Sequence, residues 1–551
     1  MTQLNLAHGL RFQDLYTRNG LIQIDEAFLN SLSQEQRAAV LSARQSPPAD
    51  KAESELITAI APALERFTAQ LFGIEAEVSA LKQGINDEEV LFEVKRRFVQ
   101  RQAVKAHRAE EALAFDPIAL KQEINALLPA HWSELDFARA VSQWEADENT
   151  TALAVATRYA AWAVATHAHP DGVLFKVPHK LDPVALIKLD TVERDGVKQH
   201  VLPKSKWRER DGFGLTDQGM NRTQALDQMN YCIWCHEQGK DSCSHGLKDK
   251  KSGEFTKSAL GITLAGCPLE EKISEMQQTK AKGFSLAALG IITIDNPMAA
   301  ATGHRICNDC MKSCIYQKQE PVDIPQSETR VLKDVLALPW GFEIYSLFTR
   351  WNPLNFARPL PLPESGYKVL VVGQGPAGYT LAHHLMNDGH HVVAIDGLKI
   401  EPLNVPFAPV HRLDELTEDL DSRVLAGFGG VAEYGITVRW DKNYLKLIRI
   451  LLERRAQFAL YGGIRFGGTI TPEDAFYRGF DHVALAMGAG RPTVIGMKNG
   501  FARGVRQASD FLMALQLTGA AQKTSLANLQ IRLPIAVIGG GLTAIDTATE
   551  A

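Results

Sequence analysis

The pattern of apolar and polar residues changes period repeatedly between residues 367 and 396. Val369 to Val372 form a continuous apolar run, which is typical of a strand buried in a parallel sheet. A helical pattern follows and ends at Gly389, and its inward face is predicted to carry Ala377, Leu381 and Leu385. The run from His391 to Ile395 predicts a second strand, directly before Asp396. This stretch is therefore predicted to be a strand–helix–strand unit.

Residues 1–185 show mostly helical periodicity. The most regular stripe alternates steps of three and four residues, through Ile57, Ile60, Leu64, Phe67, Leu71, Ile74, Val78 and Leu81. Such a stripe is typical of helix–helix packing, although Pro62 and Gly73 argue against one unbroken coiled coil. Two interpretations remain open, the core stripe of a helical domain and a helix that docks a partner. No acid–base constellation is visible in this part of the chain.

Shifts in composition predict an order of segments along the whole chain. They are a helical extension (1–185), a polar linker (186–225), a helical cysteine-rich domain (226–345), a proline-rich connector (346–366), an α/β domain (367–530) and the start of a second α/β domain (531–551). Within the α/β part, Tyr444 to Arg455 predict a helix with Leu445, Ile448, Leu451 and Leu452 inward. Phe480 to Gly490 predict a buried strand that runs into a glycine turn.

Glycines follow the first predicted strand at the G-x-G-x-x-G spacing of dinucleotide-binding folds. Gly373 allows a tight turn, Gly375 lets the backbone approach a pyrophosphate, and Gly378 lets the helix pack close to the strand. Pro376 and Ala377 begin the helix, whose N-terminus presents free N–H groups to an anion. Asp396 stands where a carboxylate can accept the ribose hydroxyls. The combination predicts a dinucleotide site.

A second fingerprint lies near the end of the chain. The apolar run Ile535 to Ile538 predicts a strand, and Gly539, Gly541 and Ala544 lead into a helix. A mononucleotide-binding half needs further strands beside the first, so the second domain is expected to be truncated at Ala551. Either the chain is a fragment of a longer polypeptide or the second motif is not functional as given.

Charge and composition exclude several classes of partner. The formal net charge of −5 argues against nucleic acid or an anionic membrane held by bulk electrostatics. No apolar run reaches membrane-spanning length, and the first residues lack the layout of a signal peptide. A cytoplasmic location is the expectation that follows.

The seven cysteines all lie between residues 232 and 314, as Cys232, Cys235, Cys243, Cys267, Cys307, Cys310 and Cys314. An odd number of closely spaced thiols suits soft-metal ligands better than structural disulfides. Iron–sulfur clusters take four such ligands each, so seven cysteines suit two clusters if one ligand comes from elsewhere. A zinc site would use only four of them, and it remains an alternative.

From about residue 229 to residue 551 the chain resembles the glutamate synthase small subunit and the N-terminal electron-entry part of dihydropyrimidine dehydrogenase. The resemblance rests on an ordered set of segments: the cysteine block, Gly266-Cys267-Pro268, TIDNPMAAATGHRICNDCMKSC at 293–314, the first fingerprint, FGGVAEYGITVRWDK at 428–442, ALAMGAG at 484–490 and VIGGGLTAID at 537–546. It implies an α/β two-dinucleotide (Rossmann-like) FAD/NAD(P) fold with its second domain truncated, preceded by an α-helical iron–sulfur domain and a mostly helical N-terminal extension.

The resemblance also implies a division of the cysteines between two [4Fe-4S] clusters. Carried over, one cluster takes Cys232, Cys235, Cys243 and Cys314, and the other takes Cys267, Cys307 and Cys310. The eighth ligand of the family follows a Pro-x-x-Ile pattern, here Pro321 to Ile324, which points to Glu328 or else to Gln326. This chain departs from the family in an insert between Cys243 and Cys267 and in a shorter gap between Cys307 and Cys310.

The same resemblance implies an electron relay. The first fingerprint would bind FAD, with Gly430 to Tyr434 and Gly488 to Gly490 lining the flavin, and the second would bind NADPH or NADH. Electrons would pass from NAD(P)H through FAD to the clusters and on to an electron-accepting flavoprotein domain or subunit. No cysteine follows Cys314, which excludes a disulfide reductase with its cysteine pair beside the flavin.

Two other functions remain open at this stage. The chain could be a non-catalytic scaffold, with a metal-stabilised cysteine block, a degenerate Rossmann remnant and an interacting helical N-terminus. It could also be a self-contained reductase whose substrate site lies within residues 1–220.

Overall fold

The computed structural model describes residues 4–551 except 188, 208–211, 399, 401, 404–407, 422–440, 490 and 491. Between Phe12 and Thr166 every described element is a helix. These elements are the 3-10 helix η1 (Phe12–Tyr16), α1 (Arg18–Ser31), α2 (Gln34–Gln45), α3 (Asp50–Phe72), α4 (Glu75–Asn86), α5 (Glu89–Val94), the π-helix η2 (Lys95–Ala103), α6 (Val104–Ala106), α7 (Ala109–Leu113), α8 (Pro117–Leu127), α9 (Glu134–Ala146) and α10 (Thr150–Thr166).

The regular stripe belongs to the core of the molecule. Helix α3 continues through Pro62 and ends at Gly73, which adopts the left-handed conformation with φ of 64°. Ile57, Ile60 and Leu64 are fully buried. Leu64 lies against Gly290 of α14 (Ser285–Asp295), so this face is covered from within the chain, as the first of the two interpretations expected.

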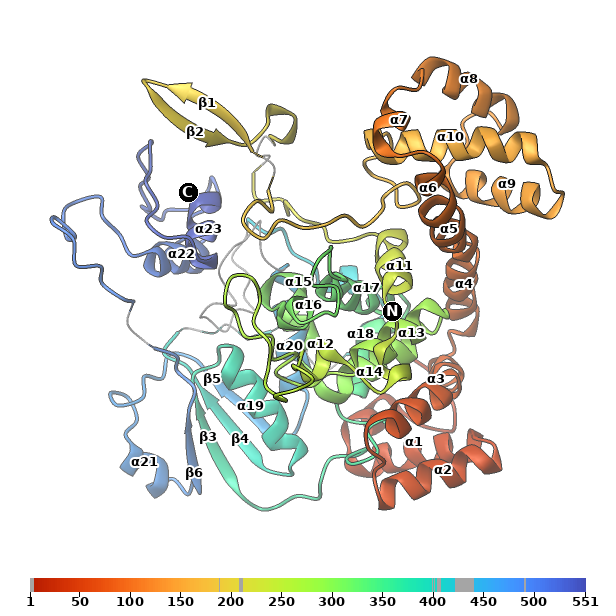
Figure 1. Cartoon of the computed structure of the whole chain (residues 1–551). Coiled ribbons are helices and arrows are strands. Elements are labelled where there is room, and N and C mark those ends of the chain that lie inside the picture. Colours follow the sequence, from red (N-terminus) through yellow and green to blue (C-terminus); the bar gives the residue numbers. More distant parts are fainter. Residues whose placement is uncertain are drawn as a thin grey trace.

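The predicted linker contains structure of its own. Strands β1 (Asp190–Arg194) and β2 (Val197–Val201) form an antiparallel hairpin, which Figure 1 shows projecting from the rest of the molecule. The short 3-10 helix η3 (Lys204–Lys206) follows. The cysteine-rich region after it is helical, as expected. Its elements are α11 (Arg222–Tyr231), η4 (Cys235–Gln238), α12 (Ser242–His245), α13 (Ile273–Ala281), α14, α15 (Ala299–Ile306), α16 (Asp309–Lys312), α17 (Ile324–Leu336) and α18 (Gly341–Phe348).

The segment expected to be a connector is partly core. Trp351, Leu354 and Phe356 are at most 1% exposed. The Trp351 ring lies 5.9 Å from Phe28 and 5.8 Å from Phe67 between centroids, so it joins the N-terminal helices to the central ones. The prediction of a connector from proline content is therefore wrong for residues 351–356, because their aromatic and aliphatic side chains are buried in the core.

The α/β part has a four-stranded parallel sheet in the order β5-β4-β3-β6. Its elements, with the helices that follow, are β3 (Lys368–Val372), α19 (Pro376–Asn387), β4 (His391–Ile395), η5 (Leu413–Leu416), α20 (Asn443–Glu453), β5 (Phe458–Tyr461), α21 (Pro472–Tyr477), β6 (His482–Leu485), α22 (Ala508–Leu517) and α23 (Leu542–Glu550). Figure 1 shows this sheet below and beside the central helices. The strand–helix–strand prediction is confirmed, and so is the helix from about 444 with its inward leucines.

Three local predictions are wrong in whole or in part. On α19 the predicted inward residue Ala377 is exposed, whereas Leu381 and Leu385 are half-buried and pack against the core. The deepest positions are Tyr379, Ala382 and Met386, because the helix packs against α20 as well as against the sheet. Strand β6 lies at a sheet edge, so its residues are exposed or half-buried. Residues 535–538 form no strand, since none of the described strands pairs with them.

Among the described residues, no helix combines the length and the apolar character needed to cross a bilayer.

Candidate functional site

The first fingerprint loop joins the carboxyl end of β3 to the N-terminus of α19, and two of its glycines are required by contact. Gly373 has φ of +93°, and a Cβ there would lie 2.6 Å from the carbonyl oxygen of Ala486. A Cβ on Gly378 would lie 1.8 Å from the carbonyl oxygen of Gly373. Gly375 is different, because a Cβ there would meet nothing within 4 Å. The open side of this loop is therefore at Gly375, where α19 begins with Pro376 and the exposed Ala377.

Asp396 lies next to this loop, at the carboxyl end of β4. Its carboxylate accepts the backbone N–H of Gln374 at 2.9 Å and that of Leu398 at 2.9 Å. A carboxylate has about four lone-pair positions, so Asp396 can accept further donors such as ribose hydroxyls. Gly488 follows β6, the neighbouring strand, with φ of +66°. The structure thus brings Gly373, Gly375, Pro376, Ala377, Gly378, Asp396 and Gly488 to one edge of the sheet, while Gly430 lies outside the described residues.

Gln374 is a feature of the loop that the sequence pattern did not single out. Its side chain is fully buried, and its Nε2 donates to the carbonyl oxygen of Gly373 at 3.0 Å. Its Oε1 is a buried acceptor that has no hydrogen-bond partner among the residues that the structure describes. Buried polar atoms are normally satisfied, so an orphan acceptor beside an open helix N-terminus fits a loop that awaits a polar ligand.

The second fingerprint is separate from the first. Gly541 caps the N-terminus of α23 with an extended backbone, as Gly375 does for α19. Gly539 has φ of +135°, and Ala544 lies in the first turn of the helix. Figure 1 shows α23 beside α22 and away from the β3–β6 sheet. Among the described strands none precedes this motif in a pair, so the described part of the site has the glycine turn and the helix of a dinucleotide site.

Four cysteines gather around the C-terminal end of α11 and form what we call group A, namely Cys232, Cys235, Cys243 and Cys314. Burial raises the pKa of Cys232 to about 12, and the nearby charges of Cys235 and Cys314 act in the same direction. A hydrogen bond between the thiols of Cys243 and Cys314 lowers the pKa of Cys314 to about 7 and raises that of Cys243. Burial also raises the pKa of Cys235 to about 11, so Cys232, Cys235 and Cys243 keep their protons at neutral pH in the absence of a metal.

Group B consists of Cys267, Cys307, Cys310 and Glu328. Burial raises the pKa of Cys310 well above its ordinary value, and after burial the largest causes are the charges of Glu328, Glu271 and Cys267. Burial also raises the pKa of Glu328 to about 7, although hydrogen bonds with Glu271 and Asn296 oppose the shift. The residues predicted for the second cluster thus face one another across α16 and α17.

Two further observations bear on the ligand set of group B. The side chain of Gln326, the alternative to Glu328, is engaged elsewhere, because its Oε1 accepts the backbone N–H of Met220 at 2.8 Å. Glu271 is a buried second carboxyl group that sequence reasoning missed. Its position four residues after Cys267 is the sequence feature that could have identified it as part of group B.

Neither group has the geometry of a single bound metal ion. Within the part of the chain that the structure describes, no three His, Cys, Asp or Glu side chains stand at the spacing of one metal ion. The chemistry of the donors is nevertheless uniform, since thiols dominate both groups and soft sulfur ligands suit iron–sulfur clusters or zinc.

A buried tyrosine links group B to the fingerprint helix. Tyr345 of α18 is fully buried and donates its hydroxyl to the carbonyl oxygen of Pro297 at 2.6 Å. Burial raises the pKa of Tyr345, and the nearby charges of Tyr379 on α19 and of Glu328 in group B raise it further. Tyr345 is thus within range of charges on both α19 and group B.

Comparison with known proteins matches two parts of the chain to protein families. Residues 6–73 match the family described as RP005 N-terminal alpha-helical domain, and residues 367–551 match the family described as pyridine nucleotide-disulphide oxidoreductase. The uncharacterized protein RP006 of Rickettsia prowazekii is 55% identical over 254 residues, which cover 46% of this chain and 36% of RP006.

Two other relatives bear on the family. The uncharacterized protein RP005 of the same organism is 31% identical over 307 residues, which cover 51% of this chain and 99% of RP005. The glutamate synthase [NADPH] small chain of Bacillus subtilis is 26% identical over 301 residues, which cover 52% of this chain and 50% of that protein. The chain thus spans half or less of RP006 and of the glutamate synthase chain, but nearly all of RP005. The chain belongs to the RP005 family, and its C-terminal part is a pyridine nucleotide-disulphide oxidoreductase similar to the glutamate synthase small subunit.

Proposed function

We propose that the chain takes electrons from NADPH or NADH, passes them through FAD to two [4Fe-4S] clusters, and delivers them to an electron-accepting flavoprotein domain or subunit. The oxidoreductase class follows from the family of residues 367–551. The observation that carries the finer proposal is the separation of the cysteines and Glu328 into two largely buried groups, in which Cys307 is the exposed member, with Tyr345 between group B and the fingerprint helix.

The residues of the fingerprint loop suit FAD. The N-terminus of α19 would bind the pyrophosphate at the open position of Gly375, and Asp396 would accept the ribose hydroxyls. The buried Oε1 of Gln374 offers one more acceptor at the same place. FAD, when bound, supplies the exchange between a hydride pair and single electrons that the clusters can carry. Gly539, Gly541 and Ala544 would bind the nicotinamide nucleotide.

The two cysteine groups suit clusters rather than single ions. Group A supplies four sulfurs, and group B supplies three sulfurs with the carboxyl group of Glu328. A cubane cluster holds its ligands on four different irons, so its donors lie farther apart than those of one ion. The raised pKa values mean that most of these thiols release protons when metal binds.

The position of Tyr345 supports an order for the relay. Because Tyr345 interacts with the charges of both Tyr379 on α19 and Glu328 in group B, we place group B first after the flavin. Group A would then receive electrons after group B. Its Cys232 lines a cavity beside α11.

The proposal is tested by metal, sulfide and flavin analysis of anaerobically purified protein, with visible spectra before and after NADPH. We expect flavin bands over a broad shoulder near roughly 400 nm, both bleached by NADPH, and about eight irons with equal sulfide. Zinc without sulfide would overturn the relay and favour a metal-stabilised scaffold. Clusters and flavin that NADPH leaves oxidised would overturn the assignment of the nicotinamide site to residues 539–544.

The division into two groups is tested by substitution. Cys314→Ser and Cys307→Ser remove one ligand from group A and group B, respectively, so each variant should retain about four irons instead of about eight. The matched control is Lys318→Gln, whose exposed side chain lies four residues after Cys314. Loss of all iron from both cysteine variants would instead indicate one shared centre.

A further inference from the structure

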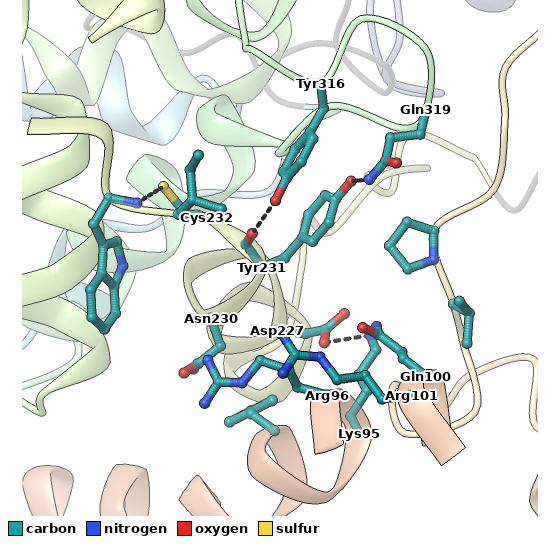
Figure 2. A pocket seen from close by; sticks show the side chains of 15 residues that line it. Lys95, Arg96, Gln100, Arg101, Asp227, Asn230, Tyr231, Cys232, Tyr316 and Gln319 are labelled. Carbon is teal, nitrogen blue, oxygen red and sulfur yellow. Dashed lines mark hydrogen bonds and ion pairs between the residues drawn. The ribbon is translucent and has the colours of Figure 1, made fainter. Parts of the chain in front are cut away.

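A cavity of about 570 Å³ lies between the N-terminal helices and α11, on the outer side of group A. This volume is within the range of small-molecule sites, roughly 300–1,000 Å³. Figure 2 shows one wall formed by side chains from the π-helix η2 and the opposite wall formed by aromatic residues near Cys232. None of the functions considered above uses this cavity.

The wall from η2 is basic. In a π-helix the hydrogen bonds run from residue i to residue i+5, which brings residues five apart toward the same side. Arg96 and Arg101 are five apart, and both line the cavity and are exposed at its rim. Lys95 also lines it, but its charge is neutralised by Asp227 at 2.5 Å, and both are buried. Two unneutralised positive charges therefore remain on this wall.

Arg97 shows that these two arginines differ from their neighbour. It lies on the same helix, points to the other side and forms an ion pair with Glu145 of α9. Arg96 and Arg101 form no ion pair or hydrogen bond with any residue that the structure describes.

The opposite wall is aromatic and fixed in place. The rings of Tyr231 and Tyr316 stack at 4.5 Å between centroids, with 11° between their planes. The hydroxyl of Tyr231 donates to the carbonyl oxygen of Glu320 at 2.8 Å and accepts Nε2 of Gln319 at 2.5 Å. Tyr316 donates to the carbonyl oxygen of Tyr231 at 3.4 Å, and Trp234 also lines this side. Rings held in this way offer an ordered apolar surface at little further entropic cost.

We propose that this cavity binds a small organic anion with a planar ring, such as an aromatic carboxylate, sulfonate or phosphate. The ring would lie against the aromatic wall, and the anionic group would bind to Arg96 and Arg101, whose planar guanidinium groups suit such anions. The basic wall belongs to η2, so the contacts to the anionic group use neither FAD nor a cluster ligand. A ligand bound there would lie next to Cys232 of group A.

The test uses the full-length protein with its cofactors and isothermal titration calorimetry, which is insensitive to colour. The probe is 8-anilino-1-naphthalenesulfonate, compared with the uncharged N-phenyl-1-naphthylamine. We expect one sulfonate per chain, and a loss of affinity of at least roughly tenfold in the double variant Arg96→Gln, Arg101→Gln, as for charge-assisted contacts. The uncharged probe should be insensitive to this change.

Two control variants make the outcome decisive. Arg97→Gln changes an adjacent arginine that faces away, so it should leave sulfonate binding unchanged. Arg96→Lys with Arg101→Lys retains the charge and should restore most of the binding, while iron content and circular dichroism stay constant in every variant. Equal loss in the Arg97→Gln variant, or unchanged binding in the double glutamine variant, would overturn the proposal. Loss of iron with sulfonate binding intact would count against the relay and not against this site.

Discussion

The three glycines of the first fingerprint differ in what surrounds them. A side chain on Gly373 or Gly378 would collide with backbone atoms of the protein itself, because oxygens lie 2.6 Å and 1.8 Å, respectively, from the Cβ position. Gly375 has open space in the same position. Its lack of a side chain therefore serves a ligand rather than the packing of the fold, whereas the other two glycines serve the fold.

Gly375→Val should fold normally and lose its flavin. The valine would occupy the space at the N-terminus of α19 in which a pyrophosphate binds, so flavin occupancy should fall below about a tenth of the wild-type value. Flavin released by denaturation, measured per chain, checks this. The contrasting variant is Gly378→Ala, which should lower stability as well. A yellow Gly375→Val protein would contradict the assignment.

At the scale of elements, a side chain from a helix of one predicted segment caps the N-terminus of a helix in another. Helix α14 begins after Phe284, whose side chain provides no cap. Its first N–H groups are satisfied instead by Glu65 of α3, which accepts Ser285 N–H at 3.1 Å and Ala287 N–H at 2.8 Å. Burial raises the pKa of Glu65 to about 7. The N-terminal extension therefore contributes a buried, titratable cap to the cysteine-rich domain.

This cap should make stability depend on pH. The folded protein holds the Glu65 proton up to about pH 7, while the ordinary pKa is 4.5, so folding binds a proton between these values. The contribution of Glu65 to stability is thus largest below pH 4.5 and is lost as the pH rises toward 7. From pH 5 to pH 8, wild type should lose about 2–3 kcal/mol more than Glu65→Gln.

Urea unfolding midpoints at the two pH values measure this difference. Glu55→Gln is the matched control, because Glu55 lies on the same helix and its exposed side chain pairs with Lys51. It should show the pH dependence of wild type. Parallel curves for Glu65→Gln and wild type would mean that other groups cause the dependence.

At the scale of the whole molecule, three segments meet at one buried ion pair. Arg454 follows α20 and donates to both carboxylate oxygens of Glu343 in α18, at 3.0 Å and 2.8 Å. Tyr16 of η1 joins them, since its hydroxyl accepts from Arg454 at 2.6 Å and donates to Glu343 at 3.2 Å. The N-terminal extension, the cysteine-rich helices and the α/β part are therefore held together by one charged cluster in the interior.

Arg454→Met should destabilise the protein by about 3–5 kcal/mol, because it leaves the Glu343 carboxylate buried without its cation. Adding Glu343→Gln should recover part of this loss, since the uncompensated charge is then removed. Chemical unfolding, together with limited proteolysis of the junctions, measures both effects. The exposed Arg503→Met serves as the control. Equal stability of Arg454→Met and wild type would show that the junction does not depend on this pair.

The sequence alone determined the local elements and the chemistry of the motifs. Strands β3 and β4 and the helix between them follow from periods of two and 3.6 residues, which the backbone imposes wherever one face is buried. The glycines and cysteines are recognisable because few other residues can replace them. Membership of the cysteine groups was available only through the resemblance to a family, since spacing alone does not say which distant thiols meet.

The tertiary structure decided every feature that depends on which helix and strand surfaces pack against each other. The buried face of α19, the edge position of β6 and the core position of Trp351 all follow from neighbours that are distant in sequence. Glu65, Glu271 and Gln374 gain their roles in the same way, because an ordinary polar residue becomes a cap, a second carboxyl group or an orphan acceptor only when folding buries it. The cavity between η2 and α11 is the clearest case, since neither wall forms a binding site by itself and only folding brings the two together.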